Sequence, residues 1–165
     1  MTDEAKATAE GVDFVLVAYR EEGVWQLEEL SPDTVTDLDT FATELRRWPG
    51  DAGALGMTSV DEDFFVLLRV LGPTTKVLLS DVTAGNDWPI ARSVLEHLGL
   101  PSPEDDDEQV PAGDLGVVAD LGVDAMAMGA LLDDFDLYPD EVLGEIATKL
   151  GFGRLYDDVV GVAAS

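Results

Sequence analysis

The chain has 165 residues, of which 35 are Asp or Glu and only 9 are Lys or Arg, so its formal net charge at pH 7 is −26. It contains no cysteine, which excludes disulfides, zinc–thiolate sites and thiol nucleophiles. A surface this acidic repels phosphate backbones, because nucleic-acid binding depends on Lys and Arg. We therefore expect no direct binding to nucleic acid or to an anionic membrane, and a basic protein as the partner that the charge allows. Acidity that serves only solubility or salt adaptation is the alternative.

The start of the chain, "MTDEAKATAEG", is polar, and we expect residues 1–11 to be disordered. It lacks the basic segment followed by an apolar one that marks a secretory signal. No apolar run approaches the length of about 18 residues that a membrane-spanning helix needs. The sequence therefore predicts a cytoplasmic protein.

Two strands and a helix come next in the chain. The segment Val12–Tyr19 is almost entirely apolar, which predicts a central strand covered on both faces, and Val24–Leu30 alternates between polar and apolar residues. Ser31 and Pro32 are typical of a helix start. Apolar residues then recur every three or four positions as far as Trp48, which predicts one amphipathic helix.

Three further strands are predicted at "GALGMTSV" (53–60), "FFVLLRVL" (64–71) and "TKVLLSDV" (75–82). The connections between them are short, which requires antiparallel pairing. A second helix follows, with Asn86 or Asp87 as its expected cap, Pro89 in its first turn and Gly99 at its end.

The predicted order of elements over residues 12–100 is therefore ββαβββα. This order predicts an α+β fold, with a five-stranded antiparallel sheet and flanking helices. It is similar to the order in longin, roadblock and profilin-like proteins, many of which are adaptors and scaffolds. That similarity concerns the order of elements, and fold alone does not carry function.

Residues 101–112, "PSPEDDDEQVPA", contain three prolines and five consecutive acidic residues. Proline disfavours helix and strand, and like charges extend a chain. Consecutive acids on an extended chain point to opposite sides, so their oxygens do not converge on a cation. The segment is therefore interpreted as a solvated linker and not as a metal site.

Residues 113–161 are predicted to form a C-terminal helical subdomain. Asp124 is the expected cap of one helix and Pro139 opens the next, which ends at Gly151 with a contact from Phe152. A last short helix is expected near Val159. Met126 and Met128, near Gly129, are a candidate surface feature of the first of these helices, although methionines on a helix are usually core residues.

Motifs for catalysis, metal binding or nucleotide binding are not found. His97 is the only histidine, and it lies late in a predicted helix, where an interaction with the last carbonyls is the ordinary explanation. Neither a P-loop nor a G-x-S-x-G motif is present. Adjacent carboxylates carry little information in a chain with 35 acids. We expect no catalytic residue, no metal and no cofactor.

The most distinctive surface feature is "DDFDLYPDE" at residues 133–141, in which aromatic and apolar residues alternate with acids. Such a pattern is typical of acidic surfaces that recognise basic partners, although a plain helix–helix turn would also give it. Trp88, just before Pro89, is a further exposed candidate, or else it covers the start of the helix. The candidate partner-binding residues are Asp133, Asp134, Asp136, Tyr138, Asp140 and Trp88.

Three stretches of the chain resemble a known family: "SVDEDFFVLLRV" (59–70), "LLSDVTAGNDWPIARSVLEHLGLP" (78–101) and "DLGVDAMAMGALLDDFDLYPDEVLGEIATKLGFG" (120–153). They are similar to the actinobacterial tRNA adenosine deaminase-associated proteins, over about Val12 to Phe152. The resemblance implies an association with the tRNA-editing adenosine deaminase, and it implies no activity or site residues. Zinc deaminases need H-x-E and P-C-x-x-C motifs, which this chain lacks, so it is not the deaminase itself.

These observations favour a non-enzymatic acidic partner or regulator of another protein, with the deaminase as a candidate. One alternative is a small-molecule sensor or enzyme that uses a groove between sheet and helices, lined by Asp81 and Trp88. Another is a dimeric structural module, because longin- and roadblock-like sheets often pair.

Overall fold

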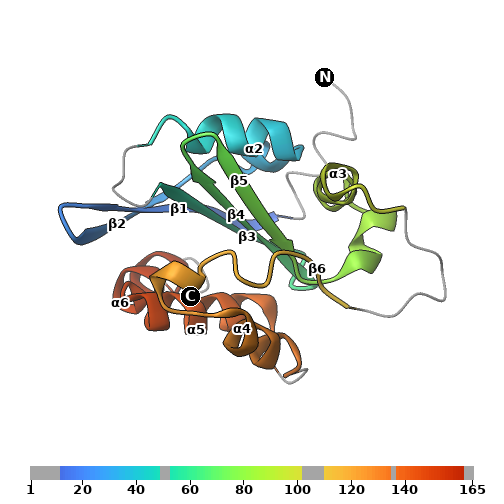
Figure 1. Cartoon of the computed structure of the whole chain (residues 1–165). Coiled ribbons are helices and arrows are strands. Elements are labelled where there is room, and N and C mark those ends of the chain that lie inside the picture. The colour runs from blue at the N-terminus through green and yellow to red at the C-terminus, as the bar shows by residue number, and fades with distance from the viewer. Residues whose placement is uncertain (1–11, 49–52, 102–109, 135–136, 162–165) are drawn as a thin grey trace.

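The computed structural model describes residues 12–48, 53–101, 110–134 and 137–161. Their centre is a sheet of six strands in which every neighbouring pair is antiparallel (Figure 1). The strands, in their order across the sheet, are β2 (Val24–Glu29), β1 (Val12–Glu21), β3 (Ala54–Val60), β4 (Phe64–Leu71), β5 (Thr74–Leu79) and β6 (Ala112–Gly113).

The prediction of an α+β fold with an antiparallel sheet is confirmed, but the prediction of five strands is wrong. The sixth strand arises where the expected linker ends, because Ala112 pairs with Leu79 and Gly113 with Leu78. Gly113 has φ of +110°, and a Cβ atom there would lie 2.2 Å from the Val77 carbonyl oxygen, so only glycine permits this approach. The similarity to longin, roadblock and profilin-like proteins is not confirmed.

The residues between the expected helix start and Trp48 form two helices and not one. A short 3₁₀-helix, η1 (Pro32–Val35), begins at Ser31 as predicted. Asp37 is then extended, and its carboxylate accepts a hydrogen bond from the Thr40 backbone N–H at 2.8 Å, so a new helix, α2 (Leu38–Leu45), begins there. The apolar residues keep a helical spacing across the junction of η1 and α2, so the sequence pattern did not indicate this break.

A similar correction applies before the second predicted helix, α3 (Pro89–Leu98). Residues 82–86 form the 3₁₀-helix η2 (Val82–Asn86), which is capped by Asp81. The N-cap of α3 is Trp88, and neither Asn86 nor Asp87 takes that role. Gly99 ends α3 in the left-handed conformation at φ of 75°, as predicted.

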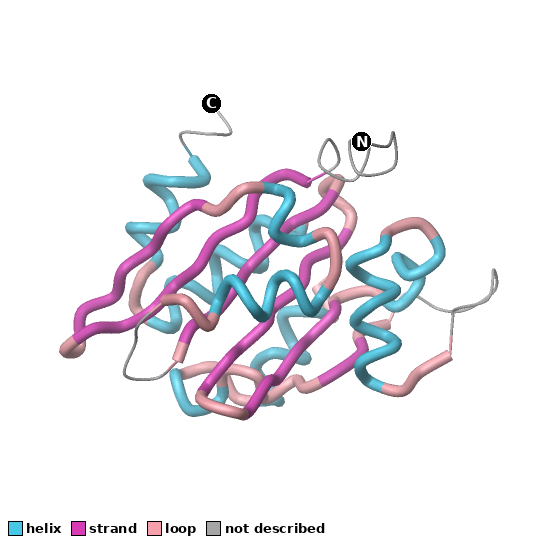
Figure 2. The backbone as a smooth tube through the Cα atoms, turned by 90° about the horizontal axis from the view of Figure 1, so that it is seen from above, coloured by secondary structure: helices cyan, strands magenta, loops and turns pink. Residues whose placement is uncertain are grey.

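Helices cover both faces of the sheet, which gives three layers. Helices α2 and α3 lie on one face (Figure 2). The other face carries η3 (Ala119–Leu121), α4 (Ala125–Leu132), α5 (Pro139–Leu150), α6 (Gly153–Tyr156) and a π-helical turn (Asp157–Gly161). Strand β1 is therefore covered on both sides, as its apolar sequence predicted.

The C-terminal helices share a hydrophobic core with the sheet. Leu16 and Leu67 of the sheet belong to the same buried cluster as Leu143 and Ile146 of α5, and all four are 0% exposed. At the sheet edge, the indole Nε1 of Trp25 donates to the Leu150 carbonyl oxygen at 3.0 Å. These contacts place residues 110–134 and 137–161 firmly against the sheet. Within the described part of the chain, no helix is long and apolar enough to cross a bilayer.

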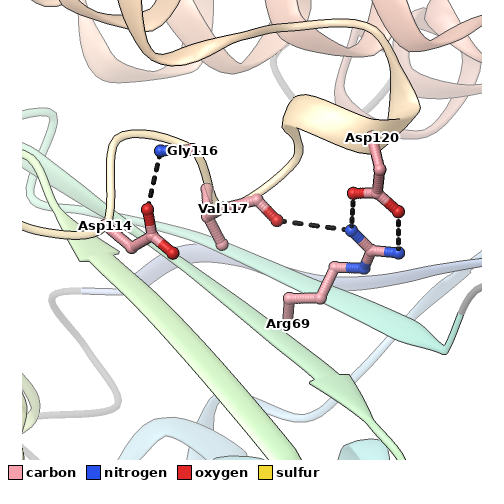
Figure 3. A network of polar contacts seen from close by, with 5 residues as sticks. All are labelled: Arg69, Asp114, Gly116, Val117 and Asp120. Carbon is pink, nitrogen blue, oxygen red and sulfur yellow. Dashed lines mark hydrogen bonds and ion pairs between the residues drawn. The ribbon is translucent and has the colours of Figure 1, made fainter.

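A buried arginine ties the first part of this C-terminal layer to the centre of the sheet (Figure 3). Arg69 of β4 is 3% exposed, and its two terminal nitrogens donate to the Asp120 carboxylate of η3 at 2.5 and 2.9 Å. One of the same nitrogens lies 3.4 Å from the Val117 carbonyl oxygen. The ion pair thus fixes η3 before α4 begins.

Candidate functional site

A groove of about 300 Å³ lies where one end of the sheet meets the α4–α5 connection. Two of its walls come from Glu62, Asp63 and Phe65 at the start of β4 and from Ser80 and Asp81 just after β5. The others come from residues 110–111 and from the C-terminal layer. We call it the acidic groove. Its lining residues are Glu62, Asp63, Phe65, Ser80, Asp81, Val110, Pro111, Leu131, Leu132, Asp133, Asp134, Leu137, Tyr138, Pro139 and Val142.

The floor of the acidic groove is apolar and well held. Phe65 is 1% exposed and Val142 is 4% exposed. The Ser80 hydroxyl accepts a hydrogen bond from the Phe65 backbone N–H at 2.9 Å, which fixes the end of β5 against β4. On the adjoining wall, the Val82 N–H donates to the Val110 carbonyl at 2.9 Å and positions Val110 beside the groove. The groove therefore offers a preformed apolar surface that an apolar side chain of a partner can contact.

Carboxylates surround this floor, and none of the described residues that line the groove is Lys or Arg. Burial raises the pKa of the Asp63 carboxyl above its usual 3.8, and the nearby charges of Asp81, Asp61 and Asp87 raise it further. Asp81 is 6% exposed, and its carboxylate accepts hydrogen bonds from the Thr83 N–H at 2.9 Å and hydroxyl at 2.6 Å. The groove therefore carries a concentrated negative potential that a cation would relieve.

The turn that presents Glu62 and Asp63 is held in an unusual conformation. Asp61 and Glu62 both have positive φ, at 54° and 50°, which non-glycine residues seldom adopt. The Asp13 carboxylate holds this turn by accepting hydrogen bonds from the Glu62 N–H at 2.8 Å and from the Ser59 hydroxyl at 2.9 Å. Strand β1 thus fixes the direction in which the acidic turn faces the groove.

Two acids lie at the C-terminus of α4, on the opposite side of the groove. Asp133 is the C-cap residue of α4, and Asp134 follows it. Helix C-termini carry a partial negative charge, so acids there lower helix stability. Both residues line the groove and add negative charge to this side of it.

The structure brings three of the predicted site residues together and separates others. Asp133, Asp134 and Tyr138 all line the acidic groove, and Tyr138 is 61% exposed. Asp140 lies instead at a separate cavity between α5 and α6, where the Tyr156 hydroxyl donates to its backbone carbonyl at 2.6 Å. Asp136 falls outside the described residues.

Trp88 lies away from the groove, on the other face of the sheet. Its ring packs against Phe64, with 6.2 Å between the ring centroids, and it belongs to the core under α3. The sequence also suggested a pocket lined by Asp81 and Trp88, and the groove contains only the first of these.

Sequence reasoning named neither Glu62 nor Asp63 as a site residue. The signal in the sequence is three consecutive acids, Asp61–Asp63, between two apolar strands, and an acidic turn accounts for them equally well. Its distance along the chain from Asp133 gave no reason to connect the two. The groove forms only because the C-terminal layer packs on the same end of the sheet.

No metal centre is found in the described ranges, which contain no group of three or more His, Cys, Asp or Glu side chains arranged to hold an ion. The carboxylates of the groove form an acidic rim around its apolar floor. Its chemistry suits an apolar contact surrounded by charge–charge interactions.

Comparison with known proteins gives the family. Residues 13–153 match the family model described as Rv3753c-like tRNA adenosine deaminase-associated protein. The chain belongs to this family. Protein Rv3753c of Mycobacterium tuberculosis (strain ATCC 25618 / H37Rv) is 39% identical over 150 residues, which cover 89% of this chain and 87% of the relative. No solved structure matches the chain.

The resemblance drawn from the sequence is thus confirmed. The matched segment of this tRNA adenosine deaminase-associated family includes the sheet from residue 13 onward and the helices α4 and α5. It contains every residue that lines the acidic groove. The groove therefore lies within the part of the chain that defines the family.

Proposed function

We propose that this protein is a non-catalytic, cytoplasmic partner of a basic protein, and that the tRNA-editing adenosine deaminase is the first candidate. The observation that carries the proposal is the acidic groove, with its apolar floor, its carboxylate rim and no Lys or Arg among its described lining residues. The family description, which names a deaminase association, supports the choice of candidate.

Electrostatics favour docking on the basic surface with which such an enzyme holds its RNA. A protein that binds tRNA presents Lys and Arg to the phosphate backbone. The net charge of −26 attracts such a surface, and it repels nucleic acids and anionic membranes. The protein would then act as a regulator that competes with tRNA.

The experiment is calorimetry with the purified deaminase from the same organism, at ionic strengths of about 0.1 M and 1 M. The Debye length falls from about 10 Å to about 3 Å over this range, so a complex held by exposed charges weakens. Transfer RNA is then added as a competitor. Salt-sensitive binding that tRNA displaces supports the proposal, and no binding at either ionic strength contradicts the choice of the deaminase.

The acidic groove also favours a second candidate function, a small-molecule sensor or enzyme. A cavity of about 300 Å³ with Asp63, whose pKa is raised, near the buried Asp81 has features common in ligand sites. A thermal-shift screen of cationic metabolites tests this function. A stabilising compound whose effect disappears in Asp63→Asn would favour it over protein binding.

A dimeric structural module is the third candidate. Strand β2 lies at one edge of the sheet, and Val24 on it is 58% exposed, so a second copy has an accessible strand to pair with. Light scattering over a range of protein concentrations tests this. A mass that stays at one chain at all concentrations contradicts it.

A further inference from the structure

Helix α4 has an outward face that the rest of the described chain does not explain. None of its eight residues is charged, and only Met128 is buried. A helix that is apolar on all sides is normally enclosed by its own protein. Helix α4 instead lies on the outer side of the C-terminal layer, away from the sheet (Figure 1). Its outer face is therefore an apolar surface on a highly acidic protein.

Met126 is the most exposed large apolar residue on this face. The usual expectation that methionines on a helix lie in the core is correct for Met128, at 0% exposed, and wrong for Met126, at 85%. Met126 and Met128 are two positions apart, which places them on nearly opposite sides of the helix, so they cannot both face the core. A flexible, exposed thioether is well suited to contact with a partner.

Gly129 lies on the same side of α4, three residues after Met126. Glycine within a helix costs about 1 kcal/mol relative to alanine, so it usually has a packing reason. For Gly144 in α5 that reason is internal, because a Cβ atom there would lie 3.2 Å from the Tyr156 ring. A Cβ atom at Gly129 would meet nothing within 4 Å. The missing side chain leaves space on the outside of the molecule.

The apolar face leads directly to the acids of the groove. Positions 126, 129, 130 and 133 follow helical spacing, so Met126, Gly129, Ala130 and Asp133 form one stripe along α4. Leu131 and Leu132 connect the helix to the groove, whose rim includes Asp134. One surface therefore combines an apolar strip about 6 Å long with the carboxylates of Asp133 and Asp134 at its C-terminal end.

We propose that this surface, which we call the α4 face, binds a basic amphipathic helix of the partner protein. The apolar side of that helix covers Met126 and Ala130, with its backbone close to Gly129. Its Lys or Arg residues lie against Asp133, Asp134 and the groove. This inference rests on the proposed function, because it specifies which part of a basic partner is recognised.

Charge argues against two other occupants of the α4 face. A second copy in antiparallel orientation would bring its Asp133 close to Asp124, the acidic cap at the other end of α4. The acidic run at residues 104–108 of the chain itself would meet the same repulsion. A basic helix would not be repelled by the acids at the ends of α4.

The test uses the full chain and two probes. One probe is the deaminase, and the other is a synthetic helical peptide of Leu and Lys with its leucines three and four residues apart. A scrambled peptide of the same composition is the control for charge alone. The variants are Gly129→Leu, which fills the open space, and Met126→Ser. The matched control is Leu100→Ser, at an exposed apolar residue just after α3. Gly129→Leu replaces glycine by a strong helix former, so the fold is retained.

Binding to each probe is expected to weaken about tenfold or more in Gly129→Leu and Met126→Ser, and to stay unchanged in Leu100→Ser. The scrambled peptide is expected to bind more weakly than the amphipathic one.

If the deaminase binds and both α4 variants bind it normally, the inference is overturned while the proposed function stands. If the deaminase does not bind but the amphipathic peptide does, in a way that Gly129→Leu abolishes, the α4 face is supported and the choice of deaminase is wrong. Equal binding of the two peptides, or binding of neither probe, overturns the inference.

Discussion

The guanidinium group of Arg69, at the centre of the sheet, forms two hydrogen bonds with the carboxylate of Asp120, which lies 51 residues later in the chain. The arginine is 3% exposed, whereas the Asp120 side chain is 57% exposed. The pair is therefore asymmetric, because one charge depends on its partner and the other is also hydrated. This asymmetry determines how the two residues respond to substitution.

Asp120→Ala is expected to destabilise the protein by about 3 kcal/mol, because it leaves a buried charge without its main partner. Arg69→Met should cost less, within about 1 kcal/mol, because methionine fills similar space and the exposed Asp120 stays hydrated. Urea unfolding at pH 7 measures both. Asp114→Ala is the control in the same loop, since its carboxylate accepts only from the Gly116 N–H among the contacts in Figure 3. A larger loss in Arg69→Met than in Asp120→Ala would contradict this account.

The same pair predicts a pH dependence at the acidic end. The hydrogen bonds from Arg69 lower the pKa of Asp120 below its usual 3.8 in the folded protein. A depressed pKa gives stabilisation that is fully present above pH 3.8 and is lost as the pH falls through the folded value. The difference in unfolding free energy between the unmodified protein and Asp120→Ala should therefore be constant near neutrality and shrink below pH 3.8. A difference that is independent of pH would exclude the ion pair as its cause.

The charged form of Asp63 is expected to destabilise the folded protein, which is the opposite of the effect of Asp120. Its pKa is raised, first by burial and then by neighbouring carboxylates, so the charged form is disfavoured in the folded protein. The penalty is present at neutral pH and disappears as the pH falls through the folded pKa. Because Asp63 is largely exposed, solvent screening keeps the effect small, so Asp63→Asn should stabilise the protein at pH 7 by at most about 0.5 kcal/mol. The gain should disappear at a pH at which Asp63 is protonated in both the folded and the unfolded protein. Asp39→Asn, in the first turn of α2, is the control of opposite sign, because Asp39 favours the helix N-terminus.

Much of the fold could be predicted from local sequence patterns, namely apolar periodicity and helix-capping residues. The continuous apolar run of β1 predicted burial on both faces, and Asp124, Pro139 and Gly151 predicted the ends of the C-terminal helices. Strand β6 could not be predicted in this way, because two residues next to a proline carry no strand periodicity. Its formation depends on Gly113 approaching the backbone of β5, which is a long-range contact.

The candidate site was predictable only in part, for a related reason. The alternation of acids with Tyr138 indicated one wall of the groove, but the opposite wall comes from a turn about 70 residues earlier in the chain. The exposure of Met126 depends on which side of α4 packs against the core, and the low amphipathicity of "AMAMGALL" does not specify that side. Composition placed acids on the surface, and only packing gathered them at one end of the sheet.

Gly129→Ala is expected to raise the free energy of unfolding by up to about 1 kcal/mol. Alanine is the better helix former, and the added methyl group meets no atom within 4 Å. Gly144→Ala is the matched control in α5, where the methyl group would lie 3.2 Å from the Tyr156 ring, and it should be neutral or destabilising. Thermal unfolding by circular dichroism measures both variants. A destabilising Gly129→Ala would show that the glycine has an internal structural role.

Charge reversal at the end of α4 separates stability from binding most directly. Asp133→Lys replaces an acid at a helix C-terminus by a base, so it should stabilise the fold by about 0.3–1 kcal/mol. The same change should weaken binding of a basic partner about tenfold, because it removes an attractive charge and adds a repulsive one. Glu96→Lys makes the same charge change in the last turn of α3, on the other face of the sheet. It should stabilise the fold similarly and leave binding intact. Equal loss of binding in the two variants would mean that the partner responds to net charge, whereas loss in Asp133→Lys alone would locate the contact at the acidic groove.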